Sequence, residues 1–470
     1  KMDSSIFRSF AFYLVLSFIV RLYGITQPPL ETAHNWRQTT VTMVARNFIE
    51  VDANILYPRI DIAGILPGIT GMEFPLLNYL IYLASLVFGY EHWYGRLINL
   101  VITTLGIWSF YGIVRKLFNE RTALYAGIIL ICSIWFMYGR KIMPDTFSVS
   151  LVMCGLYAGV RALYRPDGRK VFFKFLMAGL LIAAGVMSKL PAVVIAVAGV
   201  IPLWDKELSV SQRTSWAFVM SFCAIPVMWW YFIWSPSLTA GYGFEHFFAG
   251  VPVLQGVKEV FAEPGIILKQ FSQHATGYAG FILFICGIVM SLFIIPSKSI
   301  KVILAVCTAA FLVVMMKGGN VFLKHSYYMI PFIPCMALVT GHLLSKFRRD
   351  IAMIFVIIIC AEGLLNQHHD FRIDDDKMVL TELERQLDTF SSRDDLFLIN
   401  SGEYPTPMYF AHRRGWVNTN EMIGDPAYMS DLKNKGLDYV IIMKRSFGTD
   451  MSLSLPLVRE TEHYKVYKAQ

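Results

Sequence analysis

The chain has 470 residues, of which 55% are hydrophobic and 16% are charged, and its formal net charge is +8. Ordinary soluble domains carry about 25% charged residues, so this composition excludes an ordinary soluble protein and indicates a membrane protein. The positive charge does not indicate nucleic-acid binding, because most Lys and Arg residues lie between apolar runs and set orientation in a bilayer. All seven cysteines lie inside apolar runs, which gives no sign of a disulfide framework or a thiolate metal site.

Apolar runs of roughly 16–22 residues recur along the first 365 residues and predict a polytopic α-helical membrane module with about eleven spans. In chain order, the predicted spans are Phe7–Gly24, Trp93–Val114, Ala123–Gly139, Asp145–Tyr164, Phe173–Ser188, Pro191–Trp204, Ser215–Trp234, Gly277–Ile295, Val302–Met316, Ser326–Ser345 and Ile351–Leu365. The first run has no small-residue cleavage site, so we interpret it as a retained span.

Residues 25–92 form a long predicted loop with two amphipathic or apolar stretches. Trp36–Glu50 carries apolar residues at helical spacing, which predicts a helix lying in the membrane interface. Phe74–Gly89 begins with Phe-Pro and is marginal for a span. If this stretch is re-entrant or interfacial, all five basic connectors between later spans join the basic N-terminus on the cytoplasmic side. We therefore predict that the 25–92 loop lies outside. The connectors are Arg115–Arg121, Arg165–Lys174, Asp205–Arg213, Lys298–Lys301 and Lys346–Arg349.

The composition changes after residue 365, which predicts a membrane module of residues 1–365 and a small soluble α/β domain of residues 366–470. Leucine periodicity predicts a helix over Asp374–Ser391, and a second helix is predicted over Ala427–Lys435. Short strands are predicted at Leu396–Asn400, Tyr439–Met443 and Tyr464–Tyr467. An odd number of spans precedes this domain, which places it outside together with the first loop.

Ionisable residues gather at the external ends of the predicted spans, where polar groups line a cavity or meet headgroups. They are Glu31, His34 and Arg37 in the first loop, Glu73 before Phe74, Arg140, Lys141 and Asp145 in GRKIMPD, Lys324, His325, Tyr327 and Tyr328 in KHSYY, and Glu245 and His246. A carboxylate among them can act as a base, while Arg and Lys neutralise phosphate oxygens. A divalent cation held by Glu73 and His246 could do part of the same work.

Each residue alone has an ordinary structural explanation, such as Asp145 at the start of a helix. The joint occurrence of the groups indicates a site.

Four segments occur in an order that resembles polyprenyl-phosphate-sugar-dependent glycosyltransferases of the GT-C class. They are HNWRQTTVTMVARNF, GMEFPLLNYLIYL, the GR followed by MPD at Gly139–Asp145, and HSYYMIPFIP. Within that class, the chain is similar to bacterial relatives of protein O-mannosyltransferases and of the lipid A aminoarabinose transferase. The resemblance implies a sugar transfer at the outer face of the inner membrane. The donor would be a sugar on a polyprenyl phosphate, and the acceptor would be a hydroxyl of a glycan, lipid or protein.

The resemblance also implies roles for the acidic residues. In such enzymes an acid of the first external loop serves as the base, and another acid precedes the span after the second external loop. Asp145 matches the second position, and Glu73 matches the acid that opens the re-entrant helix. Relatives often carry an Asp-Glu pair before the Arg of the first motif, where this chain has His34 and Asn35, with Glu31 one turn earlier. The base therefore stays open among Glu31, His34 and Asp145.

A single displacement at the anomeric carbon would invert its configuration. Arg37, Arg140, Lys324 and His325 would hold the phosphate leaving group, with Glu73, Lys141, Tyr327 and Tyr328 completing the predicted substrate-binding set. The alternative is a transporter or flippase that moves a lipid-linked glycan without transfer chemistry. Transporters often show inverted repeats and broken helices at mid-membrane, and this sequence shows neither.

Overall fold

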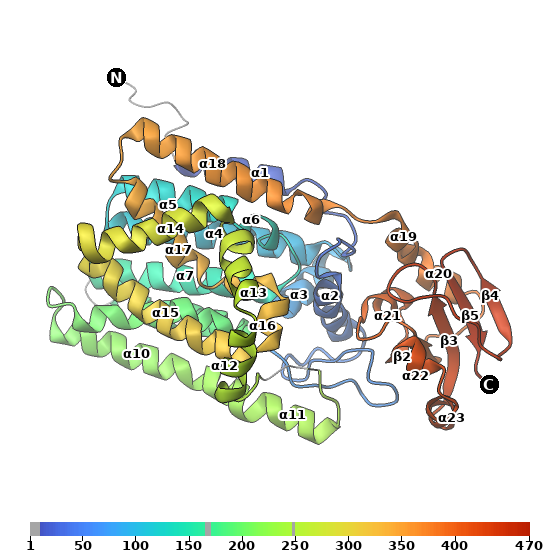
Figure 1. Ribbon diagram of the computed structural model, residues 1–470. Coiled ribbons are helices and arrows are strands. Elements are labelled where there is room, and N and C mark those ends of the chain that lie inside the picture. The colour runs from blue at the N-terminus through green and yellow to red at the C-terminus, as the bar shows by residue number, and fades with distance from the viewer. Residues whose placement is uncertain (1–9, 165–170, 247–249) are drawn as a thin grey trace. The chain divides into compact units, whose positions relative to one another are not determined.

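The computed structural model describes residues 10–164, 171–246 and 250–470 (Figure 1). Lys1, Arg8 and the start of the first predicted span lie outside the described residues, as does most of the Arg165–Lys174 connector. The chain divides into two compact units. The first unit contains Lys1–Ile25, Arg96–Ile233 and Phe248–His369, and the second contains Thr26–Gly95, Trp234–Phe247 and Asp370–Gln470.

Seven helices in the described residues are long and apolar enough to cross a membrane. They are α4 (Tyr94–Leu117), α7 (Pro144–Tyr164), α8 (Val171–Ser188), α10 with its continuation through α11 (Val210–Tyr242), α14 with its continuation (Gly277–Ile294), α15 (Lys298–Gly318) and α18 with its continuation (Arg349–Phe371). Helices are required here because lipid offers no hydrogen-bond partner to the backbone. The predicted polytopic helical fold is confirmed.

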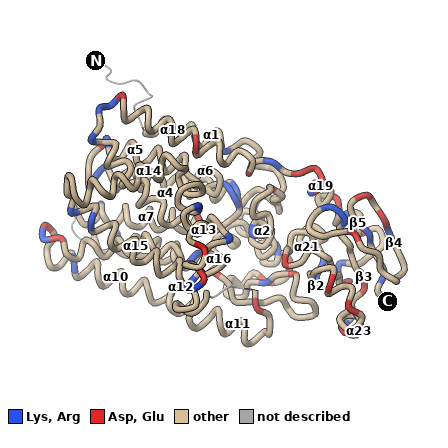
Figure 2. The backbone as a smooth tube through the Cα atoms, viewed as in Figure 1, with Lys and Arg blue, Asp and Glu red and all other residues tan. Residues whose placement is uncertain are grey.

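Shorter helices account for the other predicted spans. They are α1 (Phe10–Arg21), the broken helix Leu190–Trp204 that contains α9 (Val193–Ala196), α17 (Ile333–Leu344), and α5 (Glu120–Cys132) with α6 (Trp135–Tyr138), which divide the predicted span Ala123–Gly139. Three further short helices, α12 (Val253–Ala262), α13 (Pro264–Lys269) and α16 (Asn320–Lys324), lie between spans. Charged positions of the first unit gather at helix ends, as an apolar surrounding requires (Figure 2).

The two stretches singled out in the first loop are both helical. Helix α2 (Asn35–Glu50) is buried along most of its length, polar residues included, so protein rather than solvent surrounds it. Helix α3 (Leu76–Phe88) has 13 residues and is therefore about 20 Å long, well short of the roughly 30 Å of a bilayer core. Its length fits the predicted re-entrant or interfacial helix. Asn78 on α3 donates to the carbonyl of Val41 on α2 at 2.9 Å and joins the two helices.

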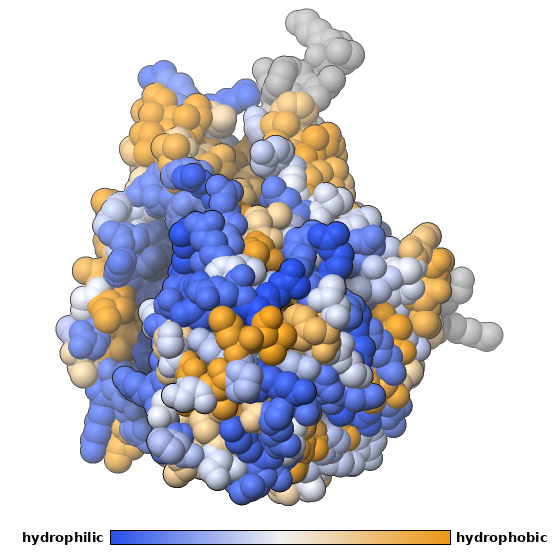
Figure 3. All heavy atoms as spheres, turned by 90° about the vertical axis from the view of Figure 1, so that its right-hand side faces the viewer, coloured by the Kyte–Doolittle hydropathy of each residue, from blue (hydrophilic) through white to orange (hydrophobic). Residues whose placement is uncertain are grey.

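The C-terminal residues form a five-stranded sheet in the order β2-β1-β3-β5-β4. The strands are β1 (Leu396–Ile399), β2 (Arg414–Val417), β3 (Leu437–Met443), β4 (Leu457–Glu460) and β5 (Tyr464–Lys468), and the helices around them are α19 (Asp375–Met378), α20 (Leu383–Leu387), α21 (Thr406–Ala411), α22 (Asn420–Ile423) and α23 (Pro426–Asn434). β2, β1 and β3 are parallel, while β5 pairs antiparallel with β3 and β4. The predicted small α/β part is confirmed, and its surface is mainly hydrophilic (Figure 3).

One hydrophobic core joins the first loop to the sheet. Alternate strand residues point to opposite faces, so Phe397 and Ile399 lie on one face and Leu398 on the other. The first face packs against residues of the first loop, including Met43, Val44 and Phe48 of α2. The predicted domain boundary at residue 366 remains a prediction. The structure adds that residues 26–95 share a folding unit with residues 370–470.

Ionic contacts reinforce this core at the end of α2. His412, in a left-handed conformation, contacts Glu50 through Nε2 at 2.8 Å and Glu384 through Nδ1 at 2.9 Å. Burial opposes ionisation of Glu384, but the hydrogen bond and charge of His412 outweigh it and lower its pKa to about 2. Burial likewise disfavours the imidazolium of His412, yet its two carboxylate partners raise its pKa above 6.5. The pKa of Glu50 is lowered, again against burial, by His412.

We expect the Glu50–His412–Glu384 bridge to stabilise the second unit most between about pH 4.5 and 6.5. The contribution of His412 is complete below its unfolded pKa and is lost as the pH rises through its raised folded pKa. The contributions of the two carboxylates are complete above their unfolded pKa and are lost as the pH falls through their lowered folded values. The unfolding midpoints of native protein and His412→Asn should therefore differ most in this window, since Asn tolerates the left-handed backbone.

The control is His368→Gln, which changes an exposed histidine of the other unit. A difference between native protein and His412→Asn that is as large at pH 9 as at pH 5.5 would contradict the bridge.

Candidate functional site

The first group of predicted site residues lies at the start of α2. Glu31 is buried, and its Oε2 accepts a hydrogen bond from Gln38 Nε2 at 2.6 Å. His34 precedes the helix with φ 60° and ψ 32°, a left-handed conformation that histidine adopts more readily than most residues. The side chain of Asn35 donates to the carbonyl of Glu31 at 3.3 Å. These contacts hold a carboxylate beside the first turns of α2, where the helix dipole favours negative charge.

Glu73 and Arg37 lie next to this helix start and form a nearly buried ion pair, although 36 positions separate them in sequence. Arg37 also lies over the ring of Trp36, with 5.5 Å from its guanidinium carbon to the ring centroid. His246 belongs to the same unit and lies close enough to Arg37 and Glu73 for both charges to change its pKa. Burial and the positive charge of Arg37 lower the pKa of His246 to about 4, with Glu73 acting in the opposite direction. Three predicted residues from three segments thus come together.

The donor set for a cation is small. A neutral imidazole at His246 suits a metal ligand, but the carboxylate of Glu73 is paired with Arg37. Within residues 10–164, 171–246 and 250–470, no group of three or more His, Cys, Asp or Glu residues could hold a metal ion. A cation at Glu73 and His246 would need further ligands from water or substrate. The predicted divalent cation stays a prediction.

The second group surrounds Asp145 in the first turn of α7. Asp145 is buried, and its Oδ1 lies 3.8 Å from Lys189 Nζ, which makes an ion pair but is too long for a hydrogen bond. Lys189 follows α8 in an extended conformation, just before the broken helix that contains Pro191. Its ammonium group also lies 5.5 Å from the centroid of the Tyr327 ring. Lys189 therefore connects the start of α7 to the KHSYY segment.

Aromatic contacts extend this group to the KHSYY segment. The rings of His325 and Tyr327 stack at 5.0 Å, and the Tyr138 hydroxyl lies 3.2 Å from Ser326 Oγ. Lys141 is fully buried and lies 5.4 Å from the centroid of the Tyr138 ring. We call this set the Asp145 cluster. Its members are Tyr138, Lys141, Asp145, Lys189, His325 and Tyr327.

The remaining predicted residues of this group are at its margin. Tyr328 is half-buried, with its ring 5.0 Å from that of Tyr327, whereas Lys324 is exposed at the end of α16. Arg140 is buried and donates to the carbonyls of Tyr23 at 2.7 Å and Gly24 at 2.9 Å. Arg140 therefore holds the turn that follows α1, a structural task beside the predicted phosphate contact. Glu245 is exposed, next to the half-buried His246.

The predicted residues thus form two groups, each within one compact unit. The group at the start of α2 lies in the second unit, and the Asp145 cluster lies in the first. Sequence reasoning did not assign Gln38 or Lys189 to the site. Lys189 had a signal, because it is the one charged residue in the apolar stretch 175–204 and stands two positions before a proline. The sequence signal for Gln38 was weaker, because Gln38 lies one turn from His34 only when this segment is a helix.

A family model described as dolichyl-phosphate-mannose-protein mannosyltransferase matches residues 72–234. The matched segment includes Glu73, Arg140, Lys141, Asp145 and Lys189. A search of curated proteins finds no match.

Solved structures match over almost the whole chain. ArnT from Cupriavidus metallidurans in the apo state has a TM-score of 0.66 at 12% identity, with 98% of this chain and 97% of that chain covered. A structure of the same protein bound to undecaprenyl phosphate gives 0.65 at 12% identity, with 98% of each chain covered. The apo oligosaccharyltransferase of Archaeoglobus fulgidus gives 0.59 at 11% identity, covering 94% of this chain and 70% of that chain.

The chain has the GT-C fold. The resemblance drawn from the four sequence segments is confirmed at this level, and the protein is a multi-pass membrane protein of that fold. The GT-C fold covers both compact units, because the ArnT match extends over the first loop and the C-terminal sheet as well as the spans.

We expect Asp145 and Lys189 to be energetically coupled. Removing one partner of a buried ion pair leaves the other charge uncompensated, so Asp145→Asn and Lys189→Met should each destabilise the protein. The double variant should lose less free energy of unfolding than the sum of the two single variants, with a coupling free energy of about 0.5–3 kcal/mol. Chemical unfolding of the purified protein in one detergent measures all four forms of the cycle.

A control cycle uses the exposed Lys324 in place of Lys189. In this cycle, the changes that Asp145→Asn and Lys324→Met make to the free energy of unfolding should be additive. Additivity in both cycles would show that the Asp145–Lys189 contact does not contribute to stability.

Proposed function

We propose that the protein is a membrane glycosyltransferase that transfers a sugar from a polyprenyl-phosphate donor to an acceptor hydroxyl at the outer face of the membrane. The Asp145 cluster carries the proposal, because it gathers a buried carboxylate and two buried or nearly buried ammonium groups inside the segment that matches the mannosyltransferase model. The ArnT structure described as bound to undecaprenyl phosphate has the same fold and supports a lipid-phosphate donor.

The reaction would be one displacement at the anomeric carbon. The acceptor oxygen forms a bond to that carbon, its proton passes to a base, and the bond from the carbon to the phosphate oxygen breaks with its electron pair on the phosphate. Attack from the face opposite the phosphate inverts the anomeric centre. The base removes the proton in the transition state, and the cationic side chains stabilise the phosphate as it leaves.

Glu31 is our first candidate for the base. It is buried beside the start of α2, and its Oε2 accepts a hydrogen bond from Gln38 Nε2 at 2.6 Å, which fixes the position of the carboxylate. Asp145 has the ammonium of Lys189 beside it, which partly neutralises its charge and suits a positioning role. His34 remains the alternative at the start of α2.

Lys141 and Lys189 are the candidates for the phosphate. Both ammonium groups lie in the Asp145 cluster, where their positive charge favours binding of phosphate oxygens. The ring of Tyr327 beside Lys189 fixes the direction of the ammonium group. Arg37 would reach the phosphate only by sharing its contact with Glu73.

Loss of the base should lower the transfer rate by about 10²- to 10⁴-fold with little change in stability. We expect this result for Glu31→Gln, with smaller losses for His34→Ala and Asp145→Asn. Transfer is measured with purified protein and a panel of undecaprenyl-phosphate sugars, scoring labelled sugar that reaches membrane acceptors.

The matched control is Glu91→Gln, an exposed acid of the same first loop, which should keep full activity. Full activity of all three variants at the candidate positions would refute this mechanism.

The proposed orientation has the basic connectors in the cytoplasm and the C-terminal sheet outside. In whole cells, a membrane-impermeant thiol reagent should then modify Glu421→Cys and leave Lys206→Cys unmodified until the membrane is opened. Both positions are exposed, the first in the sheet part and the second in a connector. Labelling of Lys206→Cys but not of Glu421→Cys would show that the orientation is the opposite of the proposed one. The parent protein is the control for labelling of native cysteines.

A further inference from the structure

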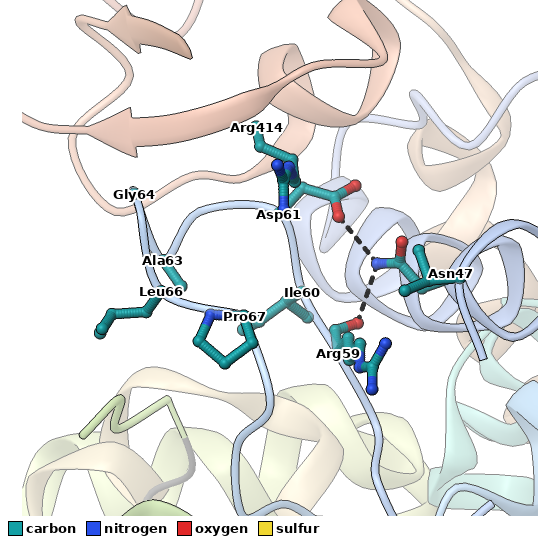
Figure 4. Close-up of a pocket in the computed structure, with 10 residues that line it drawn as sticks. Asn47, Arg59, Ile60, Asp61, Ala63, Gly64, Leu66, Pro67 and Arg414 are labelled. Atoms are coloured by element: carbon teal, nitrogen blue, oxygen red, sulfur yellow. Dashed lines mark hydrogen bonds between the residues drawn. The ribbon is translucent and has the colours of Figure 1, made fainter. Parts of the chain in front are cut away.

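A cleft of about 530 Å³ lies in the second unit, at the C-terminal end of α2 and beside β2. Its volume is within the range of roughly 300–1,000 Å³ typical of small-molecule sites. The first loop supplies one wall and the C-terminal part supplies the other. The lining residues are Asn47, Glu50, Val51, Asp61, Arg393, Asp394, His412, Arg413 and Arg414. A smaller pocket adjoins it and shares Asn47, Val51, Asp61 and Arg414 (Figure 4).

Most of the charged groups in this cleft are already held by the protein. Asp61 accepts a hydrogen bond from Arg46 at 3.0 Å. Asn47 donates to Asp61 at 2.8 Å and to the carbonyl of Arg59 at 3.1 Å, as Figure 4 shows. Arg413 is buried and donates to Asp388 at 2.7 Å. With the Glu50–His412–Glu384 bridge, these contacts make both walls rigid before any ligand arrives, which lowers the entropic cost of binding.

Two charged side chains of the cleft differ from the rest. Arg414 is the first residue of β2, and its side chain is exposed. Among the described residues, its guanidinium group has no hydrogen-bond or ion-pair partner. The carboxylate of Asp394 likewise has no such partner among the residues that the structure describes, since only its backbone N–H donates, to Ser392. A guanidinium can bind a carboxylate or phosphate through two parallel hydrogen bonds, and a carboxylate accepts from hydroxyls. The cleft thus offers one group for an anion and another for a polyol.

We propose that this cleft binds an anionic saccharide segment of the acceptor, with Arg414 on its negative group and Asp394 on its hydroxyls. The inference rests on the proposed glycosyltransferase function. Helix α2 has 16 residues and is therefore about 24 Å long, which separates the cleft from Glu31 and His34 at the other end. The bound segment is therefore a part of the acceptor distant from the hydroxyl that receives the sugar. The cleft selects the acceptor without touching the reaction.

Direct binding to the purified full-length protein tests the cleft. The probes are trigalacturonic acid, which is anionic, and maltotriose, which is an uncharged trisaccharide. We expect Arg414→Gln to weaken binding of the anionic probe about tenfold or more, and Arg414→Lys to weaken it less because the charge remains without the planar fork. Binding of the anionic probe should also fall with added salt, and binding of maltotriose should not respond to either variant.

The matched control is Arg372→Gln, which removes an exposed arginine of the same unit outside the cleft and should leave both affinities unchanged. Absence of saturable binding, or equal losses in Arg372→Gln and Arg414→Gln, would overturn the assignment.

A transfer assay on the same samples separates the two proposals. Probe binding through Arg414 without any sugar transfer would refute the glycosyltransferase function and leave the cleft as a saccharide site. Sugar transfer with an acceptor KM and a probe affinity that Arg414→Gln does not change would refute the cleft and leave the function. If both proposals hold, Arg414→Gln raises the acceptor KM and leaves kcat unchanged, because Arg414 does not touch the reacting atoms.

Discussion

The need to pair buried charges is the constraint on which the rest of this structure depends. Taking an ion out of water costs several kcal/mol unless a partner of opposite charge or a set of hydrogen bonds compensates it. Arg37 is paired with Glu73, Lys189 with Asp145, and the guanidinium of Arg140 with two carbonyls. Each pairing joins segments far apart in sequence. The pairing of buried charges therefore also determines which segments of the chain can pack together.

The same constraint explains why a polar helix lies at the centre of the second unit. The twelve buried residues of α2 include Gln38, Thr39, Arg46 and Asn47, which no lipid or hydrophobic core would accept without partners. The C-terminal part supplies them, since Arg46 donates to the carbonyl of Tyr409 at 2.9 Å and the Thr406 hydroxyl donates to Asn35 at 3.0 Å. The first loop depends on the C-terminal sheet for its hydrogen bonds as well as for its core, so the two segments form one folding unit.

Sequence reasoning found what local pattern determines. Long apolar runs predicted the spans, and alternating or continuous apolar runs predicted β1, β3 and β5. The strands β2 and β4 were not predicted, because RGWV and LVRE have only four residues each and become strands only beside β1 and β5. Two features depend on tertiary packing, and local sequence patterns do not predict them. They are the core shared by the first loop and the sheet, and the contact between Asp145 and Lys189. The identities of the site residues stay predictions, while their grouping is now a structural fact.

The helix start gives a physical reason for His34 and Asn35 at their positions. A residue at position 34 must adopt a left-handed backbone, and the next one must tie the loop to α21, as Asn35 does through Thr406. A carboxylate at position 35 would lack the amide protons with which Asn35 holds the carbonyl of Glu31. Glu31, anchored to Gln38, brings a carboxylate to the same helix end from one turn earlier. The fold thus places a negative charge at the positive end of the α2 dipole, where that charge is stabilised.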